Sequence, residues 1–312
     1  MSRNFGLGQR DMSKAGRVAL ERDSRAKGLS FSTAATVSAR WSSFVKNIHE
    51  SGVRKMEDIT GEHVKQYGRD LADRVEDGLM AASTAQNYVS AINTVMGIAT
   101  GGAWKSISPT KDCEIMRRSF IRADAPGALD RLAYGRALDA VREELGPKSA
   151  AVVELCRELG LRSKEASLFD ARSAVEEATE RGFVTITEGT KGGLEREVPI
   201  TTQEQANALV RAAAAQGDGR AVMPADADWR SWREGELRDA RELVAEHTGG
   251  GLHDLRSAYA CERYADLTGH AAPCAGGEIQ DREVDAAARE QIAAELGHGR
   301  TDVAGAYVGG RR

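Results

Sequence analysis

The segment His253-Asp-Leu-Arg256 is followed by Leu296-Gly-His298 and then, nine residues after that histidine, by Tyr307. This stretch is the most informative of the chain, because it sets two histidines, an arginine and a late tyrosine in a fixed order. A separation of three residues lets His253 and Arg256 project from one face of a helix toward the same ligand. A single His-x-x-Arg motif indicates no function by itself, so the residues that precede it in the chain have to be considered with it.

Two earlier segments supply further cations. Leu159-Gly-Leu-Arg162-Ser-Lys-Glu contains a second arginine, and Thr190-Lys191-Gly-Gly-Leu-Glu-Arg-Glu-Val contains a lysine. The glycine spacing around Lys191 is not that of a P-loop. Taken alone, Lys191 fits a solvated turn, and each arginine fits a structural ion pair. The order and local context of the whole set favour one shared site.

The ordered set resembles the tyrosine recombinase family, the phage-type integrases. The resemblance implies a site-specific DNA recombinase that cleaves and rejoins strands through a 3'-phosphotyrosine intermediate, for integration or excision of a mobile element. The implied catalytic residues are Arg162, Lys191, His253, Arg256, His298 and Tyr307.

These residue types suit that chemistry. Two guanidiniums, Arg162 and Arg256, offer fixed donors to the nonbridging oxygens of a pentavalent phosphorus and stay charged at any working pH. Lys191 would protonate the leaving 5'-oxygen. We expect no metal and no cofactor, since the phosphotyrosine bond conserves the energy needed for rejoining.

The remaining members of the set surround the nucleophile. Tyr307 would attack the phosphate. His253 would assist removal of the tyrosine proton or hold a phosphate oxygen, and His298 would give the phosphate a further hydrogen bond. The other histidines in the chain are interpreted as ordinary polar residues.

Composition indicates a mainly helical protein of two domains. The chain has 312 residues, of which 41% are hydrophobic, 29% charged and 5% aromatic, and its Ala-, Glu- and Arg-rich runs favour helices. The cysteines form neither a disulfide framework nor a CxxC motif, and no segment has the features of a signal peptide or a membrane span. We therefore expect a cytoplasmic protein with reduced thiols and no membrane partner.

The net charge of −4 argues mildly against DNA binding. A local basic face can nevertheless hold a duplex while acidic surfaces elsewhere set the total. The expected partner is double-stranded DNA. The resemblance also implies a homo-oligomer, a tetramer, when the protein assembles on two DNA sites, with a monomer allowed in the absence of DNA.

Three regions are expected along the chain. Residues 1–28 are basic and poor in apolar periodicity, which predicts a flexible arm, either a disordered tail or a DNA-contacting segment. Residues 29–121 contain three amphipathic helical patterns and resemble a helical, SAM-like core-binding domain with its linker. Its aromatic residues Trp41, Phe44 and Tyr88 are interpreted as core packing rather than base contacts. Residues 122–312 correspond to the catalytic domain.

The fold class is therefore expected to be mainly α, with an α+β catalytic domain that has a small antiparallel sheet. In this domain the sequence predicts helices over 129–145 and 150–159, a β-hairpin formed by 182–187 and 196–200 with Lys191 near its tip, and a helix over 201–215. The stretch 262–290 looks like an extra loop and helix. Within it His270 and Cys274 are spaced like half of a metal site that has no second half. The longer C-terminal helix of many relatives is not evident after Tyr307.

Two alternatives stay open. The first is a type IB topoisomerase-like enzyme, which would relax supercoiled DNA without exchanging partners. The second is a DNA-binding accessory protein that keeps the fold without catalysis, although such a protein has no need for Tyr307.

Overall fold

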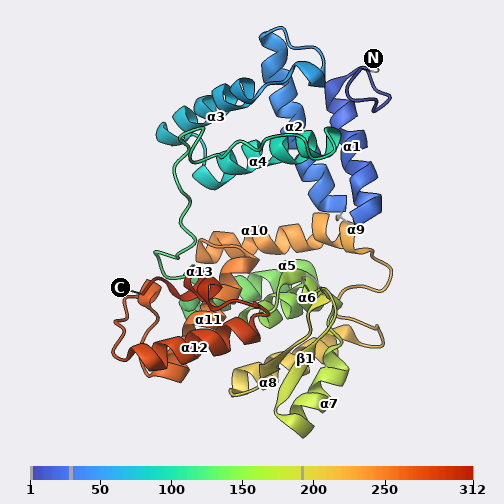
Figure 1. Cartoon of the computed structure of the whole chain (residues 1–312). Helices are drawn as coiled ribbons and strands as arrows, with labels where there is room; N and C mark the ends of the chain where they lie inside the picture. Colours follow the sequence, from blue (N-terminus) through green and yellow to red (C-terminus); the bar gives the residue numbers. More distant parts are fainter. Residues whose placement is uncertain (1–2, 28–30, 191–192, 312) are drawn as a thin grey trace. The chain divides into compact units, whose positions relative to one another are not determined.

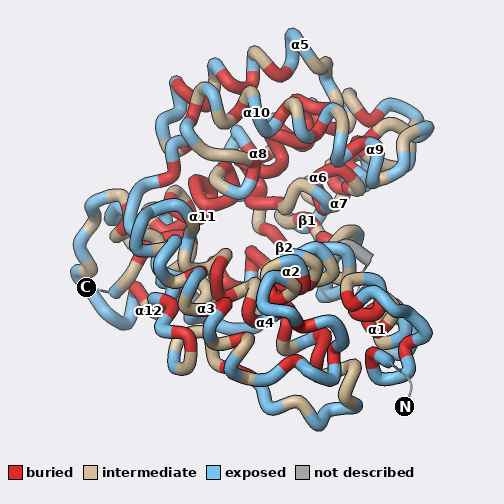
Figure 2. Tube along the Cα trace, turned by 90° about the horizontal axis from the view of Figure 1, so that it is seen from above, coloured by how far each residue is buried: buried red, intermediate tan, exposed pale blue. Residues whose placement is uncertain are grey.

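The computed structural model describes residues 3–27, 31–190 and 193–311. It divides the chain into two compact units, Met1–Ser119 and Phe120–Arg312, shown in Figure 1. Each unit has its own hydrophobic core, and Figure 2 shows the buried residues inside each unit. No helix in these ranges is both long and apolar enough to cross a membrane.

The first unit is helical throughout its regular structure. Its elements are α1 (Met12–Lys27), α2 (Phe31–Glu50), the short 3-10 helix η1 (Met56–Asp58), α3 (Gly61–Glu76) and α4 (Ala82–Ala99). The start of α3 follows from its sequence, because Thr60 and His63 cap it reciprocally. Trp41 and Phe44 on α2 are fully buried, which confirms their interpretation as core residues.

The opening segment differs from the flexible arm expected over residues 1–28. Helix α1 buries Met12 and Leu20 in the core of the first unit. The Trp41 indole donates a hydrogen bond to the Met12 carbonyl at 2.8 Å, and it lies so close to Gly16 that a Cβ there would sit 2.2 Å from the indole nitrogen. The apolar stripe of α1 consists largely of small residues, so its periodicity is weak in the sequence although its packing is tight.

The second unit is built mainly of helices around one small sheet. Its elements are η2 (Gly127–Leu129), α5 (Arg131–Glu158), α6 (Ser163–Leu168), α7 (Ala171–Arg181), β1 (Phe183–Ile186), β2 (Arg196–Pro199), α8 (Gln203–Gln216), α9 (Trp229–Glu234), α10 (Glu236–Thr248), α11 (Leu252–Thr268), η4 (Pro273–Ala275), α12 (Arg282–Glu295), η5 (Thr301–Ala304) and α13 (Gly305–Val308). This mainly α architecture with a small antiparallel sheet confirms the expected fold class.

Helix α5 is the central element of this unit, and α8, α10 and α11 pack against it. A kink at Gly146 (φ 82°), followed by Pro147, divides α5 at the point where the sequence predicts a break between two helices. The C-terminal half is almost entirely buried, with Val152, Leu155 and Cys156 fully inaccessible. It therefore holds Arg162, which lies just beyond its end, on a rigid support.

The expected hairpin is present in the described strands. Strands β1 and β2 pair antiparallel, with Val184 opposite Val198 and Ile186 opposite Arg196. Val184, Ile186 and Val198 are buried, so one face of the ribbon belongs to the core. Lys191, which the sequence places near the hairpin tip, lies outside the described residues.

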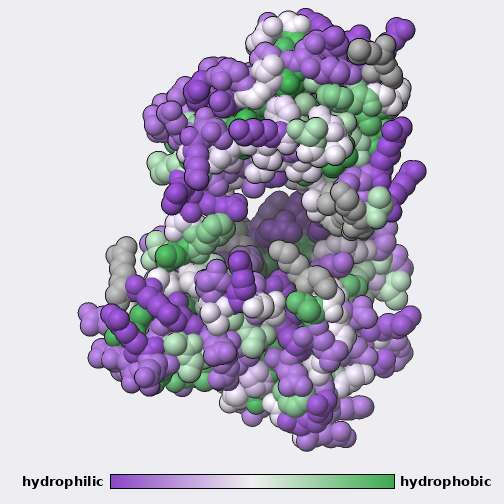
Figure 3. Space-filling model, in the orientation of Figure 1, coloured by the Kyte–Doolittle hydropathy of each residue, from purple (hydrophilic) through white to green (hydrophobic). Residues whose placement is uncertain are grey.

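The visible surface of both units is mostly polar. In Figure 3 hydrophilic residues predominate on the face shown, with scattered hydrophobic patches between them. A cavity of about 850 Å³ between α7 and β1 is lined by several acidic side chains, among them Glu176, Glu177 and Glu180. Three arginines also line it, Arg172, Arg181 and Arg220, but none of the site residues predicted from the sequence does, so the cavity is not the candidate site.

Candidate active site

Two arginines from distant parts of the chain meet at the end of α12. Arg162 follows α5 and donates a hydrogen bond from Nη2 to the main-chain oxygen of Leu296 at 3.3 Å. Arg256, on α11, donates from its own Nη2 to the same oxygen. Because one carbonyl accepts from both guanidiniums, the two cationic heads lie side by side.

The end of α12 supplies these carbonyls for a physical reason. The last carbonyls of a helix have no partner within the helix and carry its partial negative charge, so they attract cations. The Glu295 carbonyl accepts from Nε of Arg196 at 2.8 Å, and the Leu296 carbonyl accepts from Arg162 and Arg256. Gly297 then reverses the chain with φ of 64°, at a position where a Cβ would lie 2.9 Å from Arg196 Cδ.

The candidate nucleophile lies beside Arg256. The Tyr307 hydroxyl is 3.5 Å from Arg256 Nε and 3.0 Å from His298 Nε2. The His253 ring centroid is 5.6 Å from that of Tyr307, on α11 one turn before Arg256. The structure thus brings Arg162, Arg256, His253, His298 and Tyr307 together.

Burial differs among these side chains. Arg256 is fully buried and Tyr307 is 3% exposed, whereas His253 is exposed at the rim and His298 is half-buried. His298 also lines an open cleft of about 790 Å³ between the hairpin and the end of α12. The site is therefore open to solvent on the side of the two histidines.

Glu165, which sequence reasoning did not single out, is the carboxylate of the site. It is fully buried and contacts Arg162 Nη1 at 2.6 Å and Arg196 Nη2 at 2.6 Å, with Arg256 Nη1 at 3.7 Å. It also accepts from the Arg162 main-chain nitrogen at 2.7 Å. One carboxylate among three guanidiniums leaves a surplus of positive charge, which suits an anion.

The charges of this cluster shift its pKa values in directions that follow from burial and neighbours. Burial alone would raise the pKa of Glu165, but the hydrogen bonds and charge of Arg196, followed by those of Arg162, hold it below its usual value. Burial, with the nearby charge of Arg162, lowers the pKa of Arg256 to about 10, so this guanidinium stays charged at neutral pH.

The pKa of His253 is also shifted by burial and by neighbouring charges. Partial burial of its imidazole lowers the pKa of His253, although the residue lies at the exposed rim of the site, and the positive charges of Arg256 and Arg162 lower it further. Its imidazole is therefore neutral at pH 7, the form that can accept a proton from a neighbouring hydroxyl.

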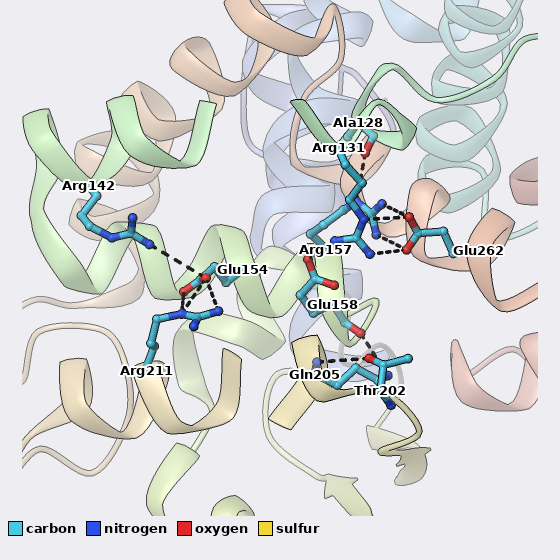
Figure 4. Close-up of polar contacts among 10 residues, drawn as sticks. All are labelled: Ala128, Arg131, Arg142, Glu154, Arg157, Glu158, Thr202, Gln205, Arg211 and Glu262. Carbon is cyan, nitrogen blue, oxygen red and sulfur yellow. Dashed lines mark hydrogen bonds and ion pairs between the residues drawn. The ribbon is translucent and has the colours of Figure 1, made fainter. Parts of the chain in front are cut away.

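An ion-pair cluster fixes the two elements that carry the arginines. Arg157, fully buried on α5, donates to both carboxylate oxygens of Glu262 on α11, at 2.9 and 2.6 Å. Arg131 reaches the same carboxylate from the start of α5, as Figure 4 shows. Burial tends to raise the pKa of Glu262, but the hydrogen bonds from Arg157 and Arg131 lower it overall. This bidentate pair ties α5, which leads to Arg162, to the helix that carries His253 and Arg256.

Glu295 ties α11 to the end of α12. Its carboxylate accepts from the Tyr259 hydroxyl at 2.7 Å and from Arg263 Nε at 3.1 Å, both on α11. These contacts hold the neighbouring Leu296 carbonyl in the place where it accepts a hydrogen bond from Arg256.

Comparisons with known proteins agree with this architecture. Residues 122–262 match the family model described as Integrase. A lambda integrase dimer bound to a COC' core site matches with a TM-score of 0.57 and 15% identity, over 93% of this chain and 75% of that one. The XerH site-specific recombinase, in a post-cleavage complex with palindromic difH, matches with a TM-score of 0.59 and 14% identity, over 95% and 80%.

A third structure, the Tn1549 transposon integrase with circular intermediate DNA, matches with a TM-score of 0.56 and 10% identity, over 95% of this chain and 96% of that one. No curated protein matches the chain.

The fold therefore defines the class: it is that of the tyrosine recombinases. Within the second unit, residues 122–262 are similar to the integrase family. The resemblance drawn from the ordered residues of the sequence is confirmed.

Proposed function

We propose that this chain is a site-specific DNA recombinase that cleaves and rejoins DNA strands through a 3'-phosphotyrosine at Tyr307. One observation carries the proposal. The guanidiniums of Arg162 and Arg256 share the Leu296 carbonyl, and the Tyr307 hydroxyl lies within 3.5 Å of Arg256. A phenol held next to two convergent cations is the arrangement that attack on a phosphodiester requires.

In this proposal the two arginines bind the scissile phosphate. Arg256 is buried in a low-dielectric setting, where its charge stabilises the extra negative charge of a pentavalent transition state more strongly than in water. Glu165 does not contact the phosphate; it orients both arginines through its carboxylate. It is a positioning residue.

The histidines act on the nucleophile and on the phosphate. His298 contacts the Tyr307 hydroxyl at 3.0 Å, and the ring of neutral His253 lies 5.6 Å from the tyrosine ring. We assign removal of the tyrosine proton to His253 and a phosphate hydrogen bond to His298. Because Tyr307 is only 3% exposed, the phosphate has to enter beside these rings to reach it.

Lys191 is proposed as the general acid for the leaving 5'-oxygen. The described strands that flank it start and end beside the site, since Arg196 on β2 pairs with Glu165. The role is assigned to Lys191 from its place in the sequence, between these two strands. Protonating an alkoxide is worth about 100-fold or more in rate.

Double-stranded DNA is the proposed substrate, and integration or excision of a mobile element is the proposed process. The first unit would hold the duplex as a second DNA-binding domain. The lambda integrase structures include a dimer bound to a core site and a tetramer bound to a Holliday junction. By that likeness we propose a tetramer on two DNA sites and propose that the protein acts in the cytoplasm.

The test is covalent trapping. Denatured protein–DNA adducts recovered from cells expressing the chain would be sequenced to find the site, and a nicked duplex carrying that site would then be used in vitro. We expect an adduct that survives denaturant, and we expect the reaction to continue in excess EDTA. Tyr307→Phe should abolish the adduct and leave DNA binding unchanged.

Tyr134→Phe is the matched control, because this buried tyrosine on α5 packs against Arg157 through its ring, and its hydroxyl has no hydrogen-bond partner in the described part of the chain. It should form adduct at the wild-type rate. An adduct that persists in Tyr307→Phe would refute the assignment of the nucleophile. Relaxation of an arbitrary plasmid by the wild type would favour a topoisomerase instead, and no adduct in any variant would favour an accessory protein.

A further inference from the structure

Two cysteines face each other directly behind Tyr307. Cys261 lies on α11 and Cys274 in η4, and their sulfurs are 3.5 Å apart. Each sulfur is also 3.5 Å from the main-chain oxygen of Tyr307. Both are free thiols, 2% and 7% exposed respectively.

The Tyr307 carbonyl depends on this pair. It lies in the last turn of α13, where helix carbonyls lack partners within the helix. Within the described parts of the chain, the donors that reach it are the two thiols. The sulfurs thus contact the backbone of the residue whose hydroxyl lies at the arginine cluster.

We propose that Cys261 and Cys274 form an oxidation site: a peroxide converts the pair to an internal disulfide, and this change slows the chemistry of Tyr307. The disulfide itself is independent of what the protein does, whereas the effect on Tyr307 rests on the proposed function.

The chemical step is balanced with a peroxide as the oxidant. The thiolate of one cysteine attacks the peroxide, which forms a sulfenic acid and releases water. The second thiol then attacks the sulfenic sulfur, which forms the S–S bond and releases a second water. Two thiols lose two electrons and two protons in total, and one hydrogen peroxide is reduced to two waters.

The surroundings favour Cys274 as the first sulfur to react. The hydrogen bond from Cys261, followed by the charges of Arg122 and Arg289, lowers the pKa of Cys274, while the same contact and burial raise the pKa of Cys261. Thiolate character and access control the reactivity of a thiol. Cys274 is favoured over Cys261 on both counts, because its pKa is the lowered one and it is the more exposed of the two, at 7% against 2%.

Geometry favours a disulfide over further oxidation. A disulfide bond is about 2.05 Å long, so the sulfurs have to approach each other by about 1.5 Å from their present 3.5 Å. The pair joins α11 to η4 across residues 262–273, a short connection within the same unit. A resolving thiol already in contact traps the sulfenic acid before it is oxidised again.

Disulfide formation removes the protons of both thiols, and this loss affects Tyr307. A disulfide has no S–H, so neither sulfur can donate to the Tyr307 carbonyl any longer. A buried carbonyl without a partner is unfavourable, and the short α13 turn has to shift to find one. Misplacing a reacting group by about 1 Å can cost about 100-fold in rate, so we expect cleavage to slow by about tenfold or more.

The experiment has two independent readouts on the full-length protein. Folded protein is treated with hydrogen peroxide, denatured, alkylated and digested. Mass spectrometry should find the Cys261 and Cys274 peptides linked to each other, while Cys113 and Cys156, which are buried outside the pair, remain alkylated. Alkylation of all four cysteines after peroxide, or a Cys274 that ends as sulfinic acid, would overturn the site.

The second readout is the rate of covalent adduct formation with a nicked DNA site. Peroxide should slow the wild type, and a dithiol reductant should restore it. Cys274→Ser should be insensitive to peroxide, whereas Cys113→Ser, which alters a buried cysteine of the first unit, should respond like the wild type. A mapped disulfide without a change in rate overturns the link to Tyr307. Absence of adduct in both redox states contradicts the proposed function and leaves the mapping result standing.

Discussion

Glu165 shows how much a single buried carboxylate contributes to this site. It contacts Arg162 and Arg196 at 2.6 Å each and lies 3.7 Å from Arg256. Without its charge, three guanidiniums would repel one another in a region where two of them are almost inaccessible to water. Removing one partner from a buried ion pair typically costs about 3–5 kcal/mol, because the remaining charge is left uncompensated.

We therefore predict that Glu165→Gln lowers the free energy of unfolding by about 3–5 kcal/mol at pH 7. The pKa of Glu165 is lower in the folded protein than its ordinary 4.5, so its contribution is fully present above that pH and is lost as the pH falls further. Urea denaturation at pH 7 and below pH 4 should show the difference between wild type and variant narrowing in acid. An equal difference at both pH values would contradict the charge argument.

His253 gives a pH dependence with a defined direction. Its pKa is below the ordinary 6.5, so the imidazole stays neutral and able to accept a proton until the pH falls below that value. The rate of adduct formation should therefore fall in acid with a midpoint below 6.5. His253→Gln should lower the neutral rate by about 100-fold and remove this acidic limb. If the variant keeps the same decrease in rate at low pH, His298 rather than His253 is the group that accepts the proton.

Residue identities at the site were only partly predictable from sequence. The order of motifs identifies Arg162, Arg256 and Tyr307, because a phenol and paired guanidiniums are needed together. Glu165 and Arg196 were missed, since a glutamate three residues after an arginine is typical of an exposed helix start. The signal that could have found Glu165 is its position in the first turn of a helix that begins directly after a buried glycine loop.

At the scale of elements, the connection between α5 and α11 places the two arginines. The pair of Arg157 and Glu262 is bidentate, with Arg157 fully buried. The charge of a buried guanidinium is compensated by such a partner, but it is left uncompensated when the guanidinium is alone in the core. The two helices are therefore held in one register by a contact that lies outside the site.

We predict that Glu262→Gln destabilises the second unit by about 3–5 kcal/mol and slows adduct formation, because α11 then shifts relative to α5. Glu242→Gln is the control, since Glu242 pairs with Arg238 on the surface at 3.8 Å with 72% of its side chain exposed. That change should alter stability by less than about 0.5 kcal/mol. Thermal unfolding followed by circular dichroism compares the two variants. Equal losses of stability would argue that the pair of Arg157 and Glu262 contributes no more than a surface pair.

Elements with strong periodicity were predictable, and weakly apolar ones were not. Gly146-Pro147 marks the kink in α5, and the alternating residues after Gly182 mark the hairpin. Helix α1 escaped prediction because its buried face depends on alanines and on Gly16 beneath Trp41, which only the fold brings together.

At the scale of the whole molecule, the chain has two hydrophobic cores that share no residue. All the described site residues belong to the second unit, Phe120–Arg312. We predict that this unit folds by itself and gives a single cooperative thermal transition, because its core is complete. A fragment of residues 120–312 that stays unfolded by circular dichroism would show that the first unit is needed to stabilise it.

The same fragment should bind DNA more weakly than the whole chain, since it would lose one of two proposed DNA-binding domains.

Sequence alone indicated two domains from length and from the break after the third helical pattern. The boundary between the units, at Ser119 and Phe120, falls in a stretch without regular structure.

The most direct measurement is to locate the DNA-linked residue by mass spectrometry. A trapped adduct is digested with nuclease and trypsin, and the peptide that carries a nucleotide is sequenced by fragmentation. The nucleotide should be attached through a phosphate to Tyr307, within the tryptic peptide 301–311. A nucleotide on Tyr259 or Tyr264, or on a residue other than tyrosine, would show that the cluster of Arg162, Arg256 and Tyr307 is not where the strand is cut.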